Sequence, residues 1–237
     1  MSNSHTPETV ALAAEARPRK IRFNKDPWSW RTHFLGLIAA IAGLVYLVVA
    51  TPAVPEKLTA MVLYGASLVL MFATSSTYHW LDLGEEGNRW LRRADHCAIF
   101  LLIAGSFLPA VVHLLDGAWR VATLATVGGM AVAGIVFKLF WLEAPRWFTA
   151  AMYVAMGWSV LVPGWRMFPL FDAAAFAWLF GGAAAYTFGA GIYASRRPDP
   201  WPGVFGFHEI WHVFVLAGAA CHFGLAVHFI DAPFAPF

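Results

Sequence analysis

The stretch Leu58–Trp80 reads LTAMVLYGASLVLMFATSSTYHW and contains no Asp, Glu, Lys or Arg. A helix needs roughly 20 mostly apolar residues to cross the hydrocarbon core of a bilayer, which is about 30 Å thick. The stretch therefore predicts a transmembrane helix. It also ends in polar side chains, Ser75 and His79, which a helix that only faces lipid does not need.

Further apolar runs of similar length lie on both sides of this stretch, separated by breaks that carry Pro, Gly or charged residues. Together they predict an all-α bundle of seven transmembrane helices. The predicted spans are Phe34–Ala50, Leu58–Trp80, Asp95–Leu115, Val121–Leu142, Trp147–Trp165, Ala173–Ala194 and Phe207–Ile230. We expect residues 1–33 to form a cytoplasmic tail with an interfacial segment, and residues 34–237 to form the membrane domain.

The composition excludes several classes of protein. Of the 237 residues, 59% are hydrophobic and 13% are charged, whereas a soluble domain has about a quarter charged residues. The net charge is only +2, and no basic block interleaves with aromatic residues, so nucleic acid is not an expected partner. Cys97 and Cys221 both lie in apolar runs, so a disulfide framework is not expected. The composition predicts an integral membrane protein whose partners are membrane lipids.

The basic residues predict the orientation, because loops rich in Lys and Arg stay on the cytoplasmic side. The chain has 16 Lys and Arg residues, and all but three fall on the side of the N-terminus in the seven-helix arrangement. The exceptions are Lys57, Arg120 and Arg166. We therefore expect a cytoplasmic N-terminus and an extracytoplasmic C-terminus, in the bacterial inner (plasma) membrane. The oligomeric state cannot be predicted.

Ionisable side chains inside membrane spans are costly and usually functional. His79 ends the second predicted span, Asp95 opens the third, and His208 and His212 open the seventh, so all four are expected near the cytoplasmic face. His208 and His212 are four residues apart and share one helix face. With His79 they could supply the three protein ligands of a catalytic zinc site, which leaves a fourth position for water.

Two further polar residues are candidates for catalysis. Ser75 lies one helical turn before His79, and Asp95 could hold or deprotonate water at the metal. Glu209 points about 100° away from His208 on an ideal helix and is interpreted as interfacial or loop-facing. His113, His222 and His228 lie toward the outer side and are interpreted as polar packing or interfacial residues, whereas His5 and His33 fall outside the predicted spans.

This pattern resembles the hemolysin III branch of the progestin and adipoQ receptor family. The resemblance rests on SSTYHW at Ser75–Trp80, on Asp95, and on FHEIWH at Phe207–His212, and it covers the whole membrane part of the chain. It implies a Zn²⁺ ion held by His79, His208 and His212 in the cytoplasmic half of the bundle, with Ser75 and Asp95 close to the metal water. The family is also similar to a wider group of membrane hydrolases.

Three functions remain open at this level. The first is a zinc-dependent hydrolase of a lipid amide or ester at the cytoplasmic side, with Asp95 as general base and Ser75 positioning water or the oxyanion. The second is a non-enzymatic membrane homeostasis or sensor protein in which zinc only clamps helices together, with Asp95 closing the site. The third is a pore-forming hemolysin, although no segment resembles a pore lining.

Overall fold

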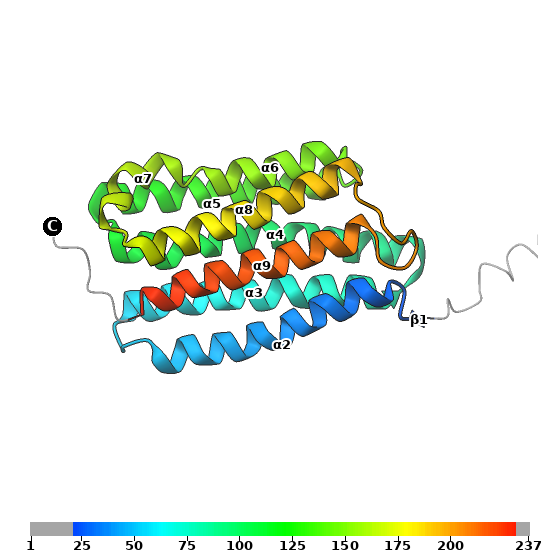
Figure 1. Ribbon diagram of the computed structural model, residues 1–237, viewed down its shortest axis with the longest axis horizontal. Coiled ribbons are helices and arrows are strands. Elements are labelled where there is room, and N and C mark those ends of the chain that lie inside the picture. Colours follow the sequence, from blue (N-terminus) through cyan, green and yellow to red (C-terminus); the bar gives the residue numbers. More distant parts are fainter. Residues whose placement is uncertain (1–20, 231–237) are drawn as a thin grey trace, which may run out of the picture.

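The structure, a computed structural model, describes residues 21–230 and is almost entirely helical (Figure 1). The first twenty residues of the predicted cytoplasmic tail, and the C-terminus predicted to be extracytoplasmic, lie outside the described residues. The helices are α2 (Pro27–Ala50), α3 (Pro55–Trp80), α4 (Gly84–Leu114), α5 (Gly117–Phe140), α6 (Arg146–Trp158), α7 (Leu161–Met167), the 3₁₀ turn η1 (Phe168–Leu170), α8 (Ala173–Ser195) and α9 (Phe207–His228).

Within residues 21–230, six helices are long and apolar enough to cross a membrane, namely α2, α3, α4, α5, α8 and α9. They coincide with six of the seven predicted spans. The remaining predicted span, Trp147–Trp165, is divided between α6 and α7. Pro163 has no N–H to donate to the carbonyl of Ser159 four residues earlier, and its ring crowds that carbonyl, which explains the interruption. A seventh crossing made by α6 and α7 together stays a prediction.

Two of the helices begin well before the predicted spans. α2 begins at Pro27 rather than Phe34, and α4 begins at Gly84 rather than Asp95. Apolar content locates only the part of a helix that lies in lipid, and the first turns of α4 carry charged residues such as Glu85 and Arg89. At 31 residues α4 is about 46 Å long, so it extends beyond a bilayer core.

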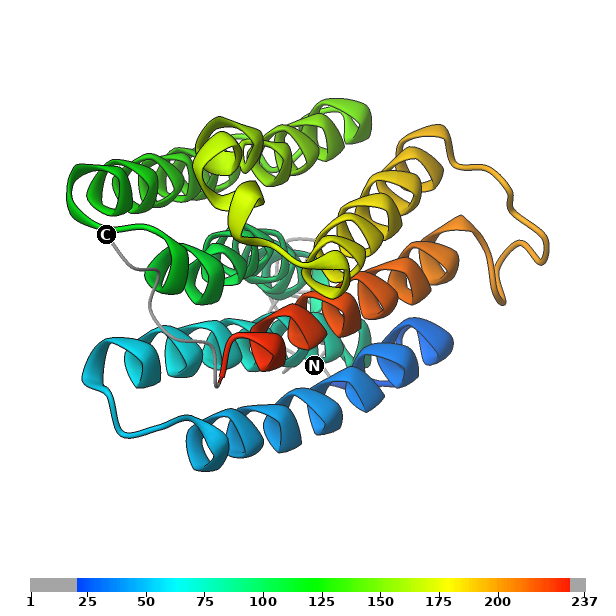
Figure 2. The same cartoon turned by 60° about the vertical axis from the view of Figure 1, so that its left-hand side comes forward.

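The long helices lie side by side along one axis, and α9 lies in the middle of the bundle (Figures 1 and 2). It packs against α2, α4 and α8. The contact with α8 is close at Gly218, which has no side chain: an added Cβ atom would lie 2.7 Å from the ring of Tyr186. Small residues allow such close approach between membrane helices.

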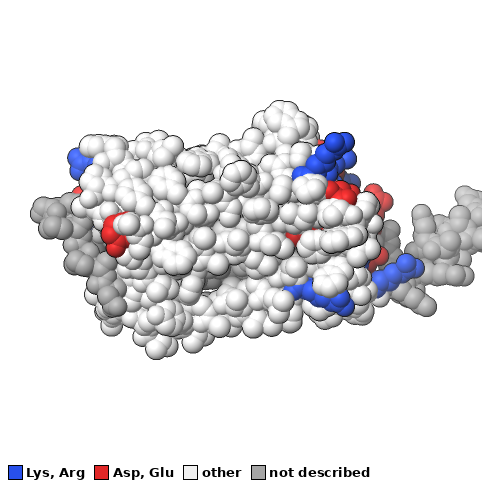
Figure 3. Space-filling view, in the orientation of Figure 1, with Lys and Arg blue, Asp and Glu red and all other residues white. Residues whose placement is uncertain are grey.

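Charged side chains gather at the two ends of the molecule and leave a wide uncharged band between them on the face shown in Figure 3. Large apolar side chains are exposed along the helices, including Val49, Val121 and Phe188. An exposed apolar band of this extent is typical of a surface in contact with lipid. The described residues therefore form a bundle suited to a bilayer.

A short antiparallel pair of strands fixes the chain that enters α2. Strand β1 (Arg22–Phe23) pairs with β2 (Leu81–Asp82), which directly follows α3. The backbone N–H of Asp26 then donates to the carbonyl of His79 at 2.9 Å. These contacts hold the start of α2 beside the end of α3, where the candidate metal ligand His79 lies.

Candidate metal centre

His79, His208 and His212 lie together at one end of the bundle, as the sequence predicts. One nitrogen from each lies within 4.8 Å of the others, and the Nε2 atoms of His79 and His208 are 3.2 Å apart. His79 and His212 are buried. Their convergence from α3 and α9 provides the donor set that a metal ion would need; their role as ligands stays a prediction.

In His79 and His212 the Nδ1 atom makes hydrogen bonds with other groups of the protein. Nδ1 of His79 lies 2.9 Å from a carboxylate oxygen of Asp26. Nδ1 of His212 lies 3.1 Å from the backbone carbonyl of Ser29 and 3.3 Å from the hydroxyl of Thr32. A ring that donates its Nδ1 proton presents the lone pair of Nε2, so these contacts turn Nε2 toward the centre of the cluster.

This geometry fits zinc. Two Zn–N bonds of the usual length at a tetrahedral angle place their nitrogens about 3.3 Å apart. The observed separation of 3.2 Å between His79 and His208 is close to that value. A carboxylate behind a metal-binding histidine, as Asp26 lies behind His79, is the usual arrangement around such ligands. The three imidazoles therefore suit a zinc ion.

Asp26 was not among the residues predicted for the site. Burial tends to raise the pKa of its carboxyl group, but the hydrogen bond with His79 and the nearby charges outweigh burial, so the pKa lies below the ordinary value. One of these charges is Lys25, whose Nζ lies 4.0 Å from the carboxylate. Asp26 precedes Pro27 at the start of α2 but makes no capping bond with its side chain, because the carboxylate faces His79 instead.

Ser75 and Asp95 both lie beside the histidines and are buried. The Ser75 hydroxyl is 2.7 Å from Nδ1 of His33. Ser75 and Asp95 line a cavity that His208 and His212 also border. The two side chains predicted for catalysis are thus brought to the candidate metal centre, while their catalytic roles stay predictions.

His33, which was predicted to lie outside the spans, belongs to the candidate metal centre. Because α2 begins at Pro27, His33 lies inside that helix, where it is buried and stacks on His212 with ring centroids 3.5 Å apart. His96 was also missed as a neighbour of the site, although it directly follows Asp95 and lines the same cavity. The pair Asp26–Pro27, a typical helix start, is the signal that could have placed Asp26 and His33 correctly.

Glu209, next to His208 on α9, makes two hydrogen bonds near the candidate metal centre. It accepts a hydrogen bond from the hydroxyl of Ser29 at 2.5 Å and another from the backbone N–H of Gly206 at 2.8 Å. The first contact ties the start of α9 to the start of α2. Its position on an ideal helix suggested an interfacial or loop-facing side chain. In the structure Glu209 instead makes hydrogen bonds within the protein.

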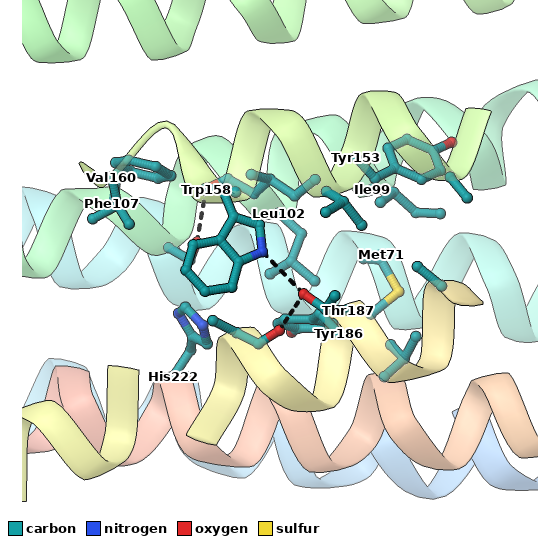
Figure 4. A pocket seen from close by; sticks show the side chains of 18 of the residues that line it. Met71, Ile99, Leu102, Phe107, Tyr153, Trp158, Val160, Tyr186, Thr187 and His222 are labelled. Atoms are coloured by element: carbon teal, nitrogen blue, oxygen red, sulfur yellow. Dashed lines mark hydrogen bonds between the residues drawn. The ribbon is translucent and has the colours of Figure 1, made fainter. Parts of the chain in front are cut away.

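A long cavity extends from the histidines into the bundle. One end is bordered by Ser75, Asp95, His208 and His212, and the other by apolar residues such as Phe107 and Leu225. Side chains from α3, α4, α6, α8 and α9 contribute to its wall, some of which Figure 4 shows. From His208 to Leu225, α9 rises about 25 Å. The residues that line the cavity are mainly apolar and lie along most of the length of α9.

Residues 21–223 match the model of a family described as haemolysin-III related. The "Hemolysin-3 homolog" of Bacillus subtilis is 29% identical over 86% of this chain and 93% of its own length. The "Hemolysin-3" of Bacillus cereus is 28% identical over 84% of this chain and 89% of its own length. The "Adiponectin receptor protein" of Drosophila melanogaster is 30% identical over 81% of this chain and 48% of its own length.

Proposed function

This chain is an integral membrane protein of the haemolysin-III related family, and we propose that it is a zinc-dependent hydrolase of a lipid amide or ester at the cytoplasmic side of the bilayer. The observation that carries the proposal is the joint position of the histidine cluster, Asp95 and Ser75 at one end of a long apolar cavity. A lipid chain in the cavity would bring its polar end to these side chains.

Each residue of the site has a separate role in the proposed hydrolysis. His79, His208 and His212 would hold zinc, which when bound polarises a carbonyl oxygen and makes water a stronger nucleophile at neutral pH. Asp95 accepts the proton of the attacking water, and Ser75 orients the water or the developing oxyanion. Breakage of the C–N or C–O bond returns that proton to the leaving group. His33 holds the Ser75 hydroxyl in place, as their contact of 2.7 Å indicates.

The topology proposed for this function has seven crossings, with α6 and α7 together forming the fifth. Their combined path follows the length of the neighbouring helices, as Figure 1 illustrates. The excess of Lys and Arg near the start of α2 and its neighbouring loops supports a cytoplasmic N-terminus and a cytoplasmic histidine cluster. The bacterial relatives support a location in the bacterial inner membrane.

The test of the proposal is turnover by purified, zinc-replete protein over a broad panel of acyl amides and esters. Asp95→Asn keeps the size of the side chain but removes the base, so it is expected to lower kcat about a hundredfold or more while the zinc content stays stoichiometric. Asp172→Asn, at the far end of α8, is the matched control and keeps full activity. Stoichiometric zinc without turnover of any substrate contradicts the proposal, and so does full activity in Asp95→Asn.

A structural zinc site is the second candidate, because the three imidazoles join α3 to α9 and would clamp the two helices. In that case His208→Ala lowers thermal stability and no chemistry exists to be lost. Retention of the fold with loss of turnover in the same variant favours the hydrolase instead. Both quantities can be measured on one preparation.

The printed names of the Bacillus relatives suggest a third candidate, a pore-forming hemolysin. This candidate predicts leakage of a trapped dye from liposomes that contain the purified protein. The cavity offers no support for it, because its wall between the histidines and Leu225 is mainly apolar. We rank it last.

A further inference from the structure

A second polar group lies in the cavity wall, well away from the histidine cluster. It consists of His222 from α9, Tyr186 and Thr187 from α8, and Trp158 from the end of α6. Figure 4 shows the four side chains close together, with the Trp158 indole directed at the Thr187 hydroxyl. We call these residues the mid-cavity group. The function proposed above uses none of them.

Half of the mid-cavity group is satisfied by the protein itself. The indole N–H of Trp158 donates to the Thr187 hydroxyl at 3.0 Å, and that hydroxyl donates to the carbonyl of Ala183 at 2.7 Å. Among residues 21–230, however, Nδ1 of His222 is fully buried and has no hydrogen-bond partner. A buried polar group without a partner costs free energy, and within a membrane span such a residue usually serves a function.

The fold holds the His222 ring in place. A Cβ atom added to Gly182 of α8 would lie 2.3 Å from Cδ2 of His222, so the absence of a side chain there is what admits the ring. On its other side the ring faces Tyr186, with centroids 5.6 Å apart. The imidazole is thus positioned beside the Tyr186 ring at the cavity wall, and its Nδ1 has no hydrogen-bond partner among the described residues.

We propose that the mid-cavity group binds a hydroxyl in the middle of the lipid chain that fills the cavity. His222 lies ten residues after His212 on α9, which corresponds to about 15 Å along the helix. The ligand class is therefore a long-chain lipid with a mid-chain hydroxyl. This inference rests on the proposed function in one respect, namely that the chain enters with its polar end at the histidine cluster.

The charge of the cavity wall selects a neutral group at this position. Apart from Asp95 at the other end, no Lys, Arg, Asp or Glu lines the cavity in the described part of the chain. A carboxylate or an ammonium group would therefore be buried without a counter-charge, which is strongly unfavourable. A hydroxyl both donates and accepts, so it can satisfy an imidazole nitrogen and the Tyr186 hydroxyl together.

The experiment measures binding of stearic acid and of its hydroxylated isomers to the full chain, by displacement of a fluorescent fatty acid. The isomers carry the hydroxyl near the carboxyl group, in mid-chain or at the methyl end. We expect the mid-chain isomer to bind about threefold to tenfold more tightly than stearic acid, which is the preference that one added hydrogen bond supplies. Equal binding of all isomers overturns the proposal, as does binding of none.

Variants separate recognition from folding. His222→Leu and Tyr186→Phe each remove hydrogen-bonding atoms while they keep most of the volume, so we expect either to remove most of the preference. Phe107→Leu changes the apolar end of the cavity and is expected to keep the preference; an unchanged preference in both polar variants contradicts the proposal. Because binding is measured without turnover, a selective preference in a protein with no hydrolase activity leaves this inference standing while the proposed function fails.

Discussion

The histidine cluster and the mid-cavity group lie along the same cavity, and they differ in the contacts that the protein gives their histidines. In the cluster at the end of the bundle, Nδ1 of His79 and of His212 is held by Asp26 and by the backbone of Ser29. In the mid-cavity group, His222 is positioned by Gly182 but its Nδ1 has no hydrogen-bond partner among the described residues. The imidazoles of His79 and His212 are therefore oriented by hydrogen bonds within the protein, whereas that of His222 is held by packing alone.

This difference has an energetic meaning. Hydrogen bonds behind a ligand residue fix its tautomer and its rotation, so a metal ion meets a site that needs little reorganisation. A buried imidazole without partners instead reduces stability until a polar group of a ligand satisfies it. Disturbing the cluster should therefore affect metal binding strongly, and disturbing the mid-cavity group should affect packing and ligand choice.

The largest effect is expected from His79→Ala, which removes one imidazole of the cluster. With only two protein ligands left on α9, zinc affinity should fall by more than about a hundredfold, the upper end of what loss of a supporting partner causes. Elemental analysis after dialysis measures this as loss of bound zinc. His228→Ala, which alters a half-exposed histidine at the far end of α9, keeps its zinc. Retention of stoichiometric zinc by His79→Ala would exclude His79 as a ligand.

A smaller effect is expected from Asp26→Asn. The amide can still accept a hydrogen bond from His79 but lacks the negative charge, so zinc affinity should fall about tenfold to a hundredfold. Competition with a zinc-binding dye measures the change. Asp116→Asn, beside the start of α5 at the opposite end, is the control with unchanged affinity. An unchanged affinity in Asp26→Asn would show that the contact of 2.9 Å does not support the ligand.

The smallest effect is expected from Gly182→Ala, which should lower stability by about 1–3 kcal/mol because the new methyl group overlaps the His222 ring. Zinc binding stays unchanged. Adding His222→Ala makes room and should restore most of the loss in thermal unfolding experiments. At Gly128 a Cβ atom meets nothing within 4 Å, so Gly128→Ala is the control and should not destabilise. If both alanine variants behave alike, the packing of His222 against α8 is misread.

Apolar content and polar spacing predicted much of this structure. Six spans follow from hydrophobic runs alone, and the spacing of His208 and His212 with a histidine at the end of another span predicted the cluster. Asp26 and His33 were not predicted because the first turns of α2 contain polar residues, which an apolar-length criterion leaves out. The interruption of the fifth span follows from Pro163. It was not predicted, because Pro163 lies within a continuous apolar run that reads as a single span.

The state of each histidine could not be predicted from sequence. Spacing places His222 on a helix, but only the packing of α8 against α9 shows that it faces the cavity and that its Nδ1 lacks a partner among the described residues. Likewise the contact of Asp26 with His79 depends on the pairing of β1 with β2, between segments far apart in the chain. Such contacts between distant segments are tertiary features that local patterns do not specify.

The central claim is that three imidazoles from α3 and α9 hold one zinc ion. X-ray absorption spectroscopy of the zinc-replete wild-type protein tests it most directly. We expect one zinc per chain with nitrogen or oxygen neighbours at about 2.0–2.1 Å and the scattering signature of three imidazoles. A preparation that holds no stoichiometric zinc, or a spectrum that contains fewer than three imidazoles, contradicts the account.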